Sequence, residues 1–280
     1  MMIDTHAHLS GLLERDINPH ELLGRLFQND FTGIIDISLK PGDLSSRIKE
    51  FSSYNRIRFA SGLWPWPASI ANRKEMLDKL EKDLLNNIEA KNKDENKNNL
   101  VCALGEFGLD HNWNGEGKEG SADLNGEREL MEMQMDLAQR LKLPVIIHSR
   151  DAAKETADVL SRFPGVRGIV HCFSYGPDAA KVFLNMGYYI SFAGNISYKN
   201  TQTILDSCAF VPLDRLFLET DCPYLAPVPF RGKASHPGMV EEVYKKTAEI
   251  RRIDMEALSE HIIENVKELF GINFNTISGG

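Results

Sequence analysis

The stretch LPVIIHSR, residues 143–150, runs directly into DAAKETADVLSRF, residues 151–163. Its central run of Val145, Ile146 and Ile147 has no polar alternation, which is typical of a strand buried on both faces in a parallel sheet. The segment that follows spaces its apolar residues as a helix does. Because a buried strand joined to a helix is the repeating unit of α/β folds, this stretch predicts one strand–helix unit.

Further apolar runs have the same character, and helical patterns separate them. The runs cover residues 1–8, 31–39, 56–64, 100–108, 166–173, 187–194 and 214–221, and the clearest helical patterns cover residues 19–30, 126–143 and 176–187. Strands and helices in this alternation favour an α/β fold of the (β/α)8 TIM-barrel type. A doubly wound open sheet is the competing architecture, but no GxGxxG motif follows the first run.

The chain is expected to form a single TIM-barrel domain over residues 1–272. Residues 86–99 depart from the strand–helix rhythm because they are dense in Asn and Lys, so we interpret them as a surface insertion. Residues 273–280 are predicted to form a flexible tail.

The composition excludes several classes of protein. No segment approaches ~18 consecutive apolar residues, so no membrane span is expected. The four cysteines form no CxxC motif, which indicates reduced thiols in a cytoplasmic protein. The net charge of −8 argues against broad coating of nucleic acid, although a bound cation would still let the protein grip one phosphodiester. Nothing in the sequence requires more than a monomer.

Polar residues gather where the predicted strands end, which is where TIM barrels place their chemistry. His6 and His8 are two positions apart in the first strand, so their side chains point to the same face. Taken singly, each such residue is more often a satisfied strand-end group or a helix cap than a ligand. The strand-end set is His6, His8, Glu106, Asp110, His148, His171, Glu219 and Asp221.

Together these residues predict a metal centre of nitrogen and oxygen ligands without thiolate. Four imidazoles and at least two carboxylates exceed what one tetrahedral ion needs, so we expect two metal ions with one carboxylate between them. Asp221 is expected to bind one metal and to accept a proton from water.

Seven long motifs occur in the order and spacing of a known family. They are IDTHAHL (3–9), GEFGLD (105–110), LPVIIHSRDA (143–152), HCFSYGPDAA (171–180), YYISFAGNISYKN (188–200), LFLETDCPYLAPVPFRGK (216–233) and ENVKELFG (264–271). In these motifs the chain resembles the TatD family of metal-dependent deoxyribonucleases, which are (β/α)8 barrels of the amidohydrolase superfamily. The resemblance extends from Ile3 to about Phe270.

The resemblance implies two divalent metal ions, Mg²⁺, Mn²⁺ or Zn²⁺, with Glu106 bridging them. It implies cleavage of DNA phosphodiester bonds by a metal-bridged hydroxide, as a 3′→5′ exonuclease on single strands, with Asp221 and Glu106 as the catalytic residues. The implied ligands are His6, His8 and Asp221 for one ion, His148 and His171 for the other, and Glu106 for both.

The basic segment FRGK after the last strand favours phosphate over amide. Arg231 offers a forked donor and Lys233 a point charge for phosphate oxygens, so both are expected to bind substrate, unless they form an ordinary exposed basic turn. Trp64, Trp66 and Tyr224 are candidates for base stacking, with Trp64 equally well placed for packing at the rim.

The chain departs from the family pattern in two places, and both leave the substrate preference open. GLWP places Trp64 where the family has a histidine, and Ser235-His236-Pro237 stands where the family reads Asn-Glu-Pro. The alternative function is therefore an amidohydrolase-type hydrolase of a small amide, ester or lactone with the same metals. A binding protein with a vestigial site is the third hypothesis, against which the intact ligand set argues.

Overall fold

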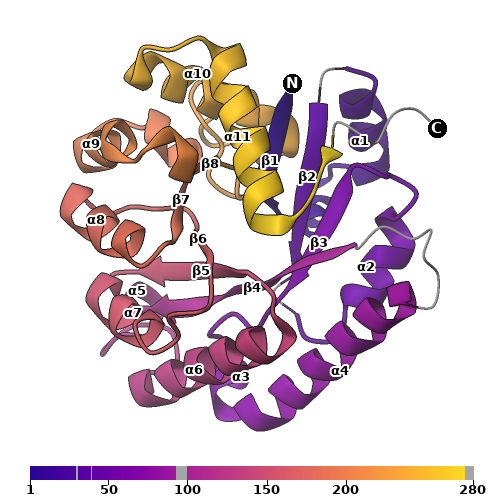
Figure 1. Cartoon of the computed structure of the whole chain (residues 1–280), viewed down its shortest axis with the longest axis vertical. Coiled ribbons are helices and arrows are strands. Elements are labelled where there is room, and N and C mark those ends of the chain that lie inside the picture. The colour runs from indigo at the N-terminus through magenta and orange to yellow at the C-terminus, as the bar shows by residue number, and fades with distance from the viewer. Residues whose placement is uncertain (30, 39, 93–99, 275–280) are drawn as a thin grey trace.

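The computed structural model describes residues 1–29, 31–38, 40–92 and 100–274 of the chain. Eight parallel strands pair in the order β1 to β8, so neighbours in the sheet are also consecutive in the chain. They occupy the middle of the molecule, and the helices surround them (Figure 1). The strands are β1 (Met2–Ala7), β2 (Phe31–Ser38), β3 (Ile57–Ser61), β4 (Val101–Asp110), β5 (Val145–Arg150), β6 (Gly168–Val170), β7 (Tyr189–Phe192) and β8 (Leu216–Leu218).

The first and last strands close the barrel. A parallel bridge joins Ala7 to Cys222, and the hydroxyl of Thr5 donates to the carbonyl of Leu218 over 3.0 Å. The predicted (β/α)8 barrel is therefore confirmed, and its closure uses the segment just after β8 in addition to the strand itself.

Helices follow the strands around the barrel. They are α1 (Pro19–Phe27), α2 (Leu44–Phe51), α3 (Pro67–Ala71), α4 (Arg73–Asn92), α5 (His111–Asn114), α6 (Leu124–Leu141), α7 (Ala153–Leu160), α8 (Pro177–Asn185), α9 (Gln202–Phe210), α10 (Val240–Arg251) and α11 (Met255–Phe270). Short 3-10 turns are η1 (Leu9–Arg15), η2 (Gly194–Ser197), η3 (Leu213–Arg215) and η4 (Pro237–Met239).

Local sequence explains how helix α1 begins. The side chain of Asn18 accepts hydrogen bonds from the backbone N–H groups of His20 and Glu21, and Pro19 occupies the first turn, where its missing N–H costs nothing. The predicted helical pattern over residues 19–30 therefore starts as expected and gives a helix that ends at Phe27.

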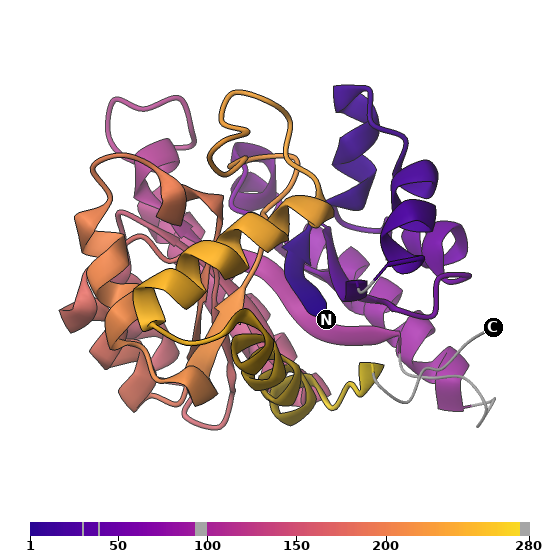
Figure 2. The ribbon, with the colours of Figure 1, turned by 90° about the horizontal axis from the view of Figure 1, so that it is seen from above.

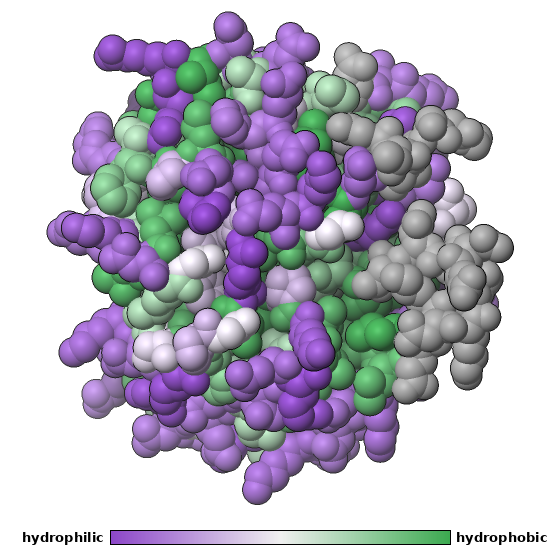
Figure 3. All heavy atoms as spheres, viewed as in Figure 1, coloured by the Kyte–Doolittle hydropathy of each residue, from purple (hydrophilic) through white to green (hydrophobic). Residues whose placement is uncertain are grey.

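Burial of the strands on both faces forms the core. All eight residues of β2 and all ten of β4 are buried. This accounts for their continuous apolar runs, since one face of each strand packs inside the barrel and the other beneath the helices. On the surface, hydrophilic residues dominate the periphery and hydrophobic residues lie between them toward the middle of the view (Figure 3).

The C-terminal boundary of the packed chain lies beyond the predicted one. Phe274 is buried, its ring lies beneath the guanidinium of Arg58, and a Cβ added to Gly33 of β2 would stand 2.6 Å from that ring. The predicted tail over 273–280 is thus wrong for Phe274, because Gly33 leaves room for an aromatic ring against the sheet. Residues 275–280 lie outside the described part.

The Asn- and Lys-rich segment 86–99 divides into two parts. Its first residues continue α4, which extends to Asn92, while residues 93–99 lie outside the described part. The interpretation of this segment as a surface insertion stays a prediction. Among the described helices, none combines the length and apolar composition that crossing a bilayer requires.

Candidate metal centre

The segments that follow β1, β4 and β8 lie along one edge of the barrel, the upper edge in Figure 2. Closure of the barrel brings the segment after β1 and the segment after β8 together at this edge. The backbone N–H of Asp221 donates to the carbonyl of His6 over 3.0 Å, and that of His8 donates to Cys222 over 2.9 Å. The carboxylate of Asp221 consequently lies 3.6 Å from Nε2 of His6 and 3.4 Å from Nε2 of His8.

A second contact holds Asp221 in place through its neighbour Thr220. The buried carboxylate of Asp4 in β1 accepts from the backbone N–H of Thr220 over 2.9 Å, and its other oxygen lies 2.6 Å from the Thr220 hydroxyl. It also accepts from the backbone N–H of His6 over 3.2 Å. Burial raises the pKa of Asp4 to about 8. Asp4 therefore links the backbone of His6 in β1 to the backbone of Thr220 after β8.

Two glycines bring β4 close to β5 on either side of Glu106. Gly105 and Gly108 have φ angles of +154° and +156°, which side chains rarely adopt. A Cβ on Gly108 would stand 1.9 Å from the carbonyl oxygen of His148, and one on Gly105 would stand 2.7 Å from Cβ of Ile146. Only glycine permits this approach, which sets Glu106 beside the histidine at the end of β5.

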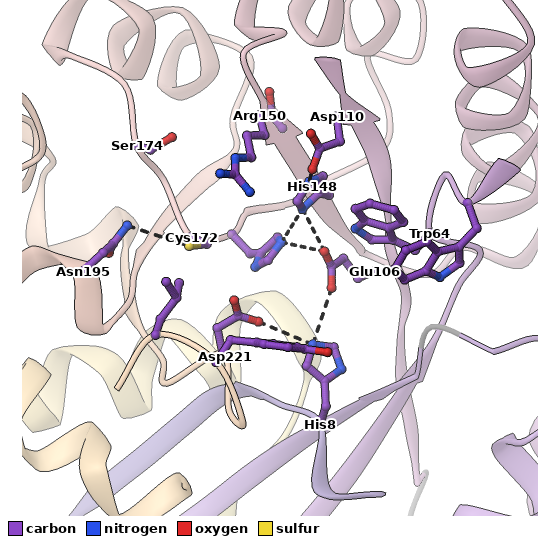
Figure 4. Close-up of a pocket in the computed structure, with 15 residues that line it drawn as sticks. His8, Trp64, Glu106, Asp110, His148, Arg150, Cys172, Ser174, Asn195 and Asp221 are labelled. Atoms are coloured by element: carbon purple, nitrogen blue, oxygen red, sulfur yellow. Dashed lines mark hydrogen bonds and ion pairs between the residues drawn. The ribbon is translucent and has the colours of Figure 1, made fainter. Parts of the chain in front are cut away.

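The carboxylate of Glu106 lies between two groups of histidines, one at each oxygen (Figure 4). Oε2 is 3.2 Å from Nε2 of His6 and 3.7 Å from Nε2 of His8. Oε1 is 2.9 Å from both Nδ1 of His148 and Nε2 of His171. We refer to His6, His8 and Asp221 as the first group and to His148 and His171 as the second group.

The spacing of these atoms suits metal ligands. Nε2 of His6 and Nε2 of His8 are 3.2 Å apart, and Nδ1 of His148 is 3.1 Å from Nε2 of His171. Ligand nitrogens at ~2.0–2.1 Å from a tetrahedral ion lie about 3.3 Å from each other. Among the described residues, three sets have ligand atoms close enough to share one cation, namely His6, His8 and Glu106, then Glu106, His148 and His171, and also His6, His171 and Asp221.

Three of the four histidines have a partner that sets which ring nitrogen faces the centre. The other ring nitrogen lies 3.0 Å from the carbonyl of Ile37 in His8 and 3.2 Å from Glu219 in His171, while in His148 it lies 2.9 Å from Asp110. These partners only accept, so the outer nitrogen carries a proton, and the inner nitrogen can offer a lone pair to a cation once it holds no proton of its own. This arrangement is characteristic of histidines that bind metals.

Electrostatics keep the carboxylate of Glu106 ionised. Burial by itself raises the pKa of Glu106, but the charge of His171 and hydrogen bonds from His148, His171 and His6 outweigh it and hold that pKa well below its usual range. In His171, burial lowers the pKa, but the charge and hydrogen bond of Glu106 and the contact with Glu219 raise it well above its ordinary value. Glu106 is thus ionised and paired with protonated His171 when no cation is bound.

A similar balance between burial and neighbouring groups, His8 among them, sets the pKa of Asp221. Burial raises the pKa of Asp221, but the hydrogen bond from His8 and the charges of His6 and His171 outweigh it, so that this pKa lies below its usual value. The Asp221 side chain is 15% exposed, whereas that of His6 is 0% exposed, so Asp221 reaches the opening of the site.

A pocket of about 530 Å³ opens above the two groups. This volume lies within the ~300–1,000 Å³ that small-ligand sites usually have. In the close-up view Trp64 stands on one side of the pocket, Cys172 and Asn195 stand on the other, and Arg150 lies beside the centre (Figure 4). The lining residues are His8, Trp64, Trp66, Glu106, Asp110, His148, Ser149, Arg150, His171, Cys172, Ser174, Asn195, Asp221, Tyr224 and Leu225.

The structure brings together the predicted metal-binding set but not the predicted phosphate-binding pair. Arg231 and Lys233 are absent from the pocket lining. The guanidinium of Arg231 lies 4.4 Å from the ring centre of Tyr198, and the ammonium of Lys233 lies 5.8 Å from that of Phe230. The loop after β8 places both cations against aromatic rings outside this pocket, and the expectation that they bind substrate stays a prediction.

The positive charge in the pocket comes instead from Arg150, which sequence reasoning did not single out. Within the part of the chain that the structure describes, its side chain makes no hydrogen bond or ion pair. A signal was present, because Arg150 follows His148 by two residues in β5 and therefore shares its face. Asn195, the first polar residue beyond β7's buried run, was also missed, and its buried Oδ1 has no partner among the described residues.

Comparison with known proteins agrees with this geometry. The sequence matches the TatD related DNase family over residues 3–271. It is 32% identical over 275 residues to the metal-dependent hydrolase YabD of Bacillus subtilis (strain 168), covering 98% of this chain and 100% of that protein. It is 30% identical over 279 residues to the metal-dependent hydrolase YcfH of Escherichia coli (strain K12), covering 97% of this chain and 96% of that protein.

A solved structure extends the agreement to three dimensions. The crystal structure of YjjV, a TatD homologue from Escherichia coli K12, has a TM-score of 0.77 to this chain at 28% identity, covering 97% of this chain and 98% of that one. The family match over nearly the full length, together with the relatives above, shows that this chain is a metal-dependent hydrolase and belongs to the TatD related DNase family.

Proposed function

We propose that this protein is a deoxyribonuclease that removes nucleotides from the 3′ end of single-stranded DNA with two divalent cations, Mg²⁺, Mn²⁺ or Zn²⁺. The observation that carries the proposal is the position of Glu106, whose two carboxylate oxygens face two separate histidine groups. A carboxylate shared in this way is the arrangement that two-cation phosphodiesterases use.

Each group contributes a defined set of donors. The first group would hold one cation with two imidazole nitrogens and Asp221, and the second group would hold the other with His148 and His171. Glu106 contributes one oxygen to each. When bound, the cations would lower the pKa of water and offset the charge that develops on the phosphate.

Asp221 is proposed as the proton acceptor. Its pKa lies below the usual value because the hydrogen bond from His8 and the charges of His6 and His171 outweigh the effect of burial, so it is ionised at neutral pH. It lines the pocket, and its contact with His8 orients the carboxylate toward the two groups. A positioned, ionised carboxylate at this place can take the proton of the attacking water.

Arg150 is proposed to bind the phosphate of the substrate. Its guanidinium is a planar, permanently charged fork that matches two phosphate oxygens at once. It lines the same pocket as Glu106 and Asp221, and its charge acts on the carboxylate of Asp110 without a direct ion pair among the described residues. Arg231 and Lys233 remain candidates for contacts with a longer strand outside the pocket. We also propose that the protein acts in the cytoplasm as a monomer.

The decisive experiment is digestion of single-stranded DNA by protein first stripped with EDTA and then supplied with Mg²⁺, Mn²⁺ or Zn²⁺. Label at the 5′ end reports progressive shortening from the 3′ end, and label at the 3′ end reports release of the terminal nucleotide. The matched control is Glu106→Gln, which keeps the side-chain shape but removes its charge and shows that activity comes from this centre and not from a contaminating nuclease.

A parallel panel of amides, esters and lactones tests the alternative chemistry. The proposal predicts DNA hydrolysis that depends on added metal and on Glu106. Intact DNA with every metal, alongside turnover of a member of the panel, would replace the deoxyribonuclease with a hydrolase of small C–N or C–O bonds.

A further inference from the structure

The chain's tryptophans form a single cluster beside the metal centre. The sequence contains three, Trp64, Trp66 and Trp113. The rings of Trp64 and Trp66 are 4.2 Å apart between centroids, and the ring of Trp113 meets that of Trp66 edge-on at 6.0 Å. Trp64 in turn packs against His148 at 5.4 Å. The cluster is therefore continuous with the second group.

The turn that carries this cluster is held rigidly. Pro65 and Pro67 flank Trp66 and restrict the backbone on either side of it. The side-chain amide of Gln134 in α6 pairs with both backbone groups of Leu63, at 2.7 Å and 3.0 Å. The amide of Asn114 in α5 donates to the carbonyl of Pro65 over 2.9 Å. Anchors from two helices thus hold the backbone of the turn that carries Trp64 and Trp66.

The cluster divides into a supporting part and an exposed part. Trp64 is 8% exposed, whereas Trp66 is 39% exposed, which is unusual for so large an apolar side chain. Both line the pocket, while Trp113 packs against Trp66 without lining it. Trp66 accordingly presents an accessible indole to the pocket, supported by two other aromatic rings.

A second exposed aromatic ring lines the same pocket from another side. Tyr224, in the loop after β8, is 50% exposed, and its ring meets that of His8 at 6.2 Å. His8 directly follows β1 and His148 belongs to β5, and these two strands lie on opposite sides of an eight-stranded barrel. Trp64 packs on His148 and Tyr224 on His8, so the two aromatic surfaces flank the metal centre.

We infer that Trp66 is a stacking platform for an unpaired nucleobase of the strand whose phosphodiester lies at the metal centre, with Tyr224 contacting the base from the other side. This inference rests on the proposed function and specifies its substrate as an end with an unstacked, unpaired base. Aromatic platforms bind single strands without regard to sequence, because every base offers a flat face. A duplex end must unpair before its base can reach the indole.

Intrinsic fluorescence tests binding directly, since all the tryptophan emission of the chain arises from this cluster. The probe is a phosphorothioate-linked thymidine pentamer, which resists hydrolysis, added to the metal-loaded protein. A pentamer of the same charge built from abasic residues is its counterpart. Stacking predicts quenching by the thymidine strand and little quenching by the abasic strand.

Substitutions then assign the effect to Trp66. Trp66→Ala is expected to weaken binding of the thymidine strand by about 5- to 150-fold, the range for loss of one base–aromatic stack, while Trp66→Phe keeps most of it. Fluorescence anisotropy of a labelled strand measures both affinities. Phe210→Ala, which removes an exposed aromatic ring on α9 away from the pocket, is the matched control and should bind as the wild type does.

The outcomes separate this inference from the proposed function. Equal binding of thymidine and abasic strands, no binding of either, or unchanged affinity in Trp66→Ala overturns the stacking platform, even if DNA is hydrolysed. Base-dependent binding through Trp66 supports it, and if DNA then stays intact with every metal, the proposed nuclease activity alone is refuted.

Discussion

Nε2 of His148 lies 2.9 Å from a carboxylate oxygen of Asp110, and this contact turns Nδ1 of His148 toward Glu106, also at 2.9 Å. Asp110 is itself fixed, because its backbone N–H donates to Glu127 of α6 over 2.7 Å. Carboxylates that orient a ligating histidine in this way raise its affinity for the metal.

Asp110→Ala should weaken the cation at the second group by about 10- to 100-fold, because the ring of His148 loses both its tautomer and its orientation. Asp110→Asn should retain part of the affinity, since its amide oxygen still accepts a hydrogen bond. Metal titration by calorimetry measures both. Asp136→Ala, at an exposed surface ion pair, serves as the control. Identical metal affinity in Asp110→Ala and wild type would remove Asp110 from the centre.

His6→Ala and His171→Ala should each fold yet bind fewer cations. Each removes a ligand from only one group, so the content expected is about one ion per chain in place of about two. Glu106→Ala removes a ligand from both and should lose both. Elemental analysis of the purified proteins gives the ratio, and circular dichroism checks the fold. Full metal content and unchanged cleavage in His6→Ala would contradict the assignment.

Metal binding should release protons and should weaken as the pH falls. In the metal-free protein the charge of Glu106 outweighs the lowering effect of burial and raises the pKa of His171 well above its ordinary value, so His171 holds a proton that a cation must displace. Calorimetry in two buffers of different ionisation enthalpy counts the protons released. Affinity that stays constant as the pH changes would show that neutral imidazoles are not the ligands.

The raised pKa of His171 also predicts how the stability of the metal-free fold changes with pH. The contribution of protonated His171 is complete below its unfolded pKa of 6.5 and is lost as the pH rises through the raised folded pKa. With metal bound, stability should instead rise with pH, because the cation prefers deprotonated histidines. Melting temperatures in EDTA and in Mg²⁺ across this range should therefore diverge as the pH rises.

Arg150→Ala should raise KM for a dinucleotide and for a long single strand alike, because Arg150 lines the pocket at the reacting phosphate. Loss of a charge-assisted hydrogen bond costs ~1.5–3 kcal/mol, or about 10- to 150-fold. Lys233→Ala should affect only the longer strand, since Lys233 lies outside the pocket. Steady-state kinetics on the two substrates separates these effects, and a larger loss on the dinucleotide in Lys233→Ala would restore the FRGK segment as the phosphate site.

Arg47→Ala should destabilise the fold by about 3–5 kcal/mol, because it leaves the buried carboxylate of Asp36 without its partner at 2.6 Å. Asp36 also accepts from the backbone N–H of Leu9, directly after His8. Urea unfolding measures the change. Arg140→Ala breaks an exposed pair with Glu81 and should cost less than ~1 kcal/mol. Similar costs for the two variants would show that the buried pair adds no more than a surface one.

Much of the site was predictable because a barrel converts sequence position into spatial position. Parallel strands all end at one rim, so His6, His148 and His171 had to meet once the alternation of apolar runs identified the strands. Asp221 joined them because the first and last strands close the sheet. That these residues bind metal remains a prediction which the geometry favours.

Side-chain direction within loops was not predictable. Arg231 lies in the loop after β8 and packs on Tyr198, a direction that no local pattern signals, whereas Arg150 lies in β5, where strand alternation with His148 did signal its direction toward the pocket. Asp110 was visible as a strand-end carboxylate, but its role depends on the contact with His148. Such contacts depend on packing between segments far apart in the sequence, which local periodicity does not encode.

The sequence by itself determined the barrel and the rim at which polar groups gather, because these follow from strand periodicity and from the closure of the sheet, whereas the division of the ligands into two groups was implied by the resemblance to the TatD family. Only the tertiary structure decided how the two oxygens of Glu106 are shared, which arginine enters the pocket, and that three tryptophans form one cluster beside it. The tryptophan cluster depends on how α5 and α6 pack against the turn after β3, through the contacts of Asn114 and Gln134, and all three features rest on contacts between segments far apart in the sequence.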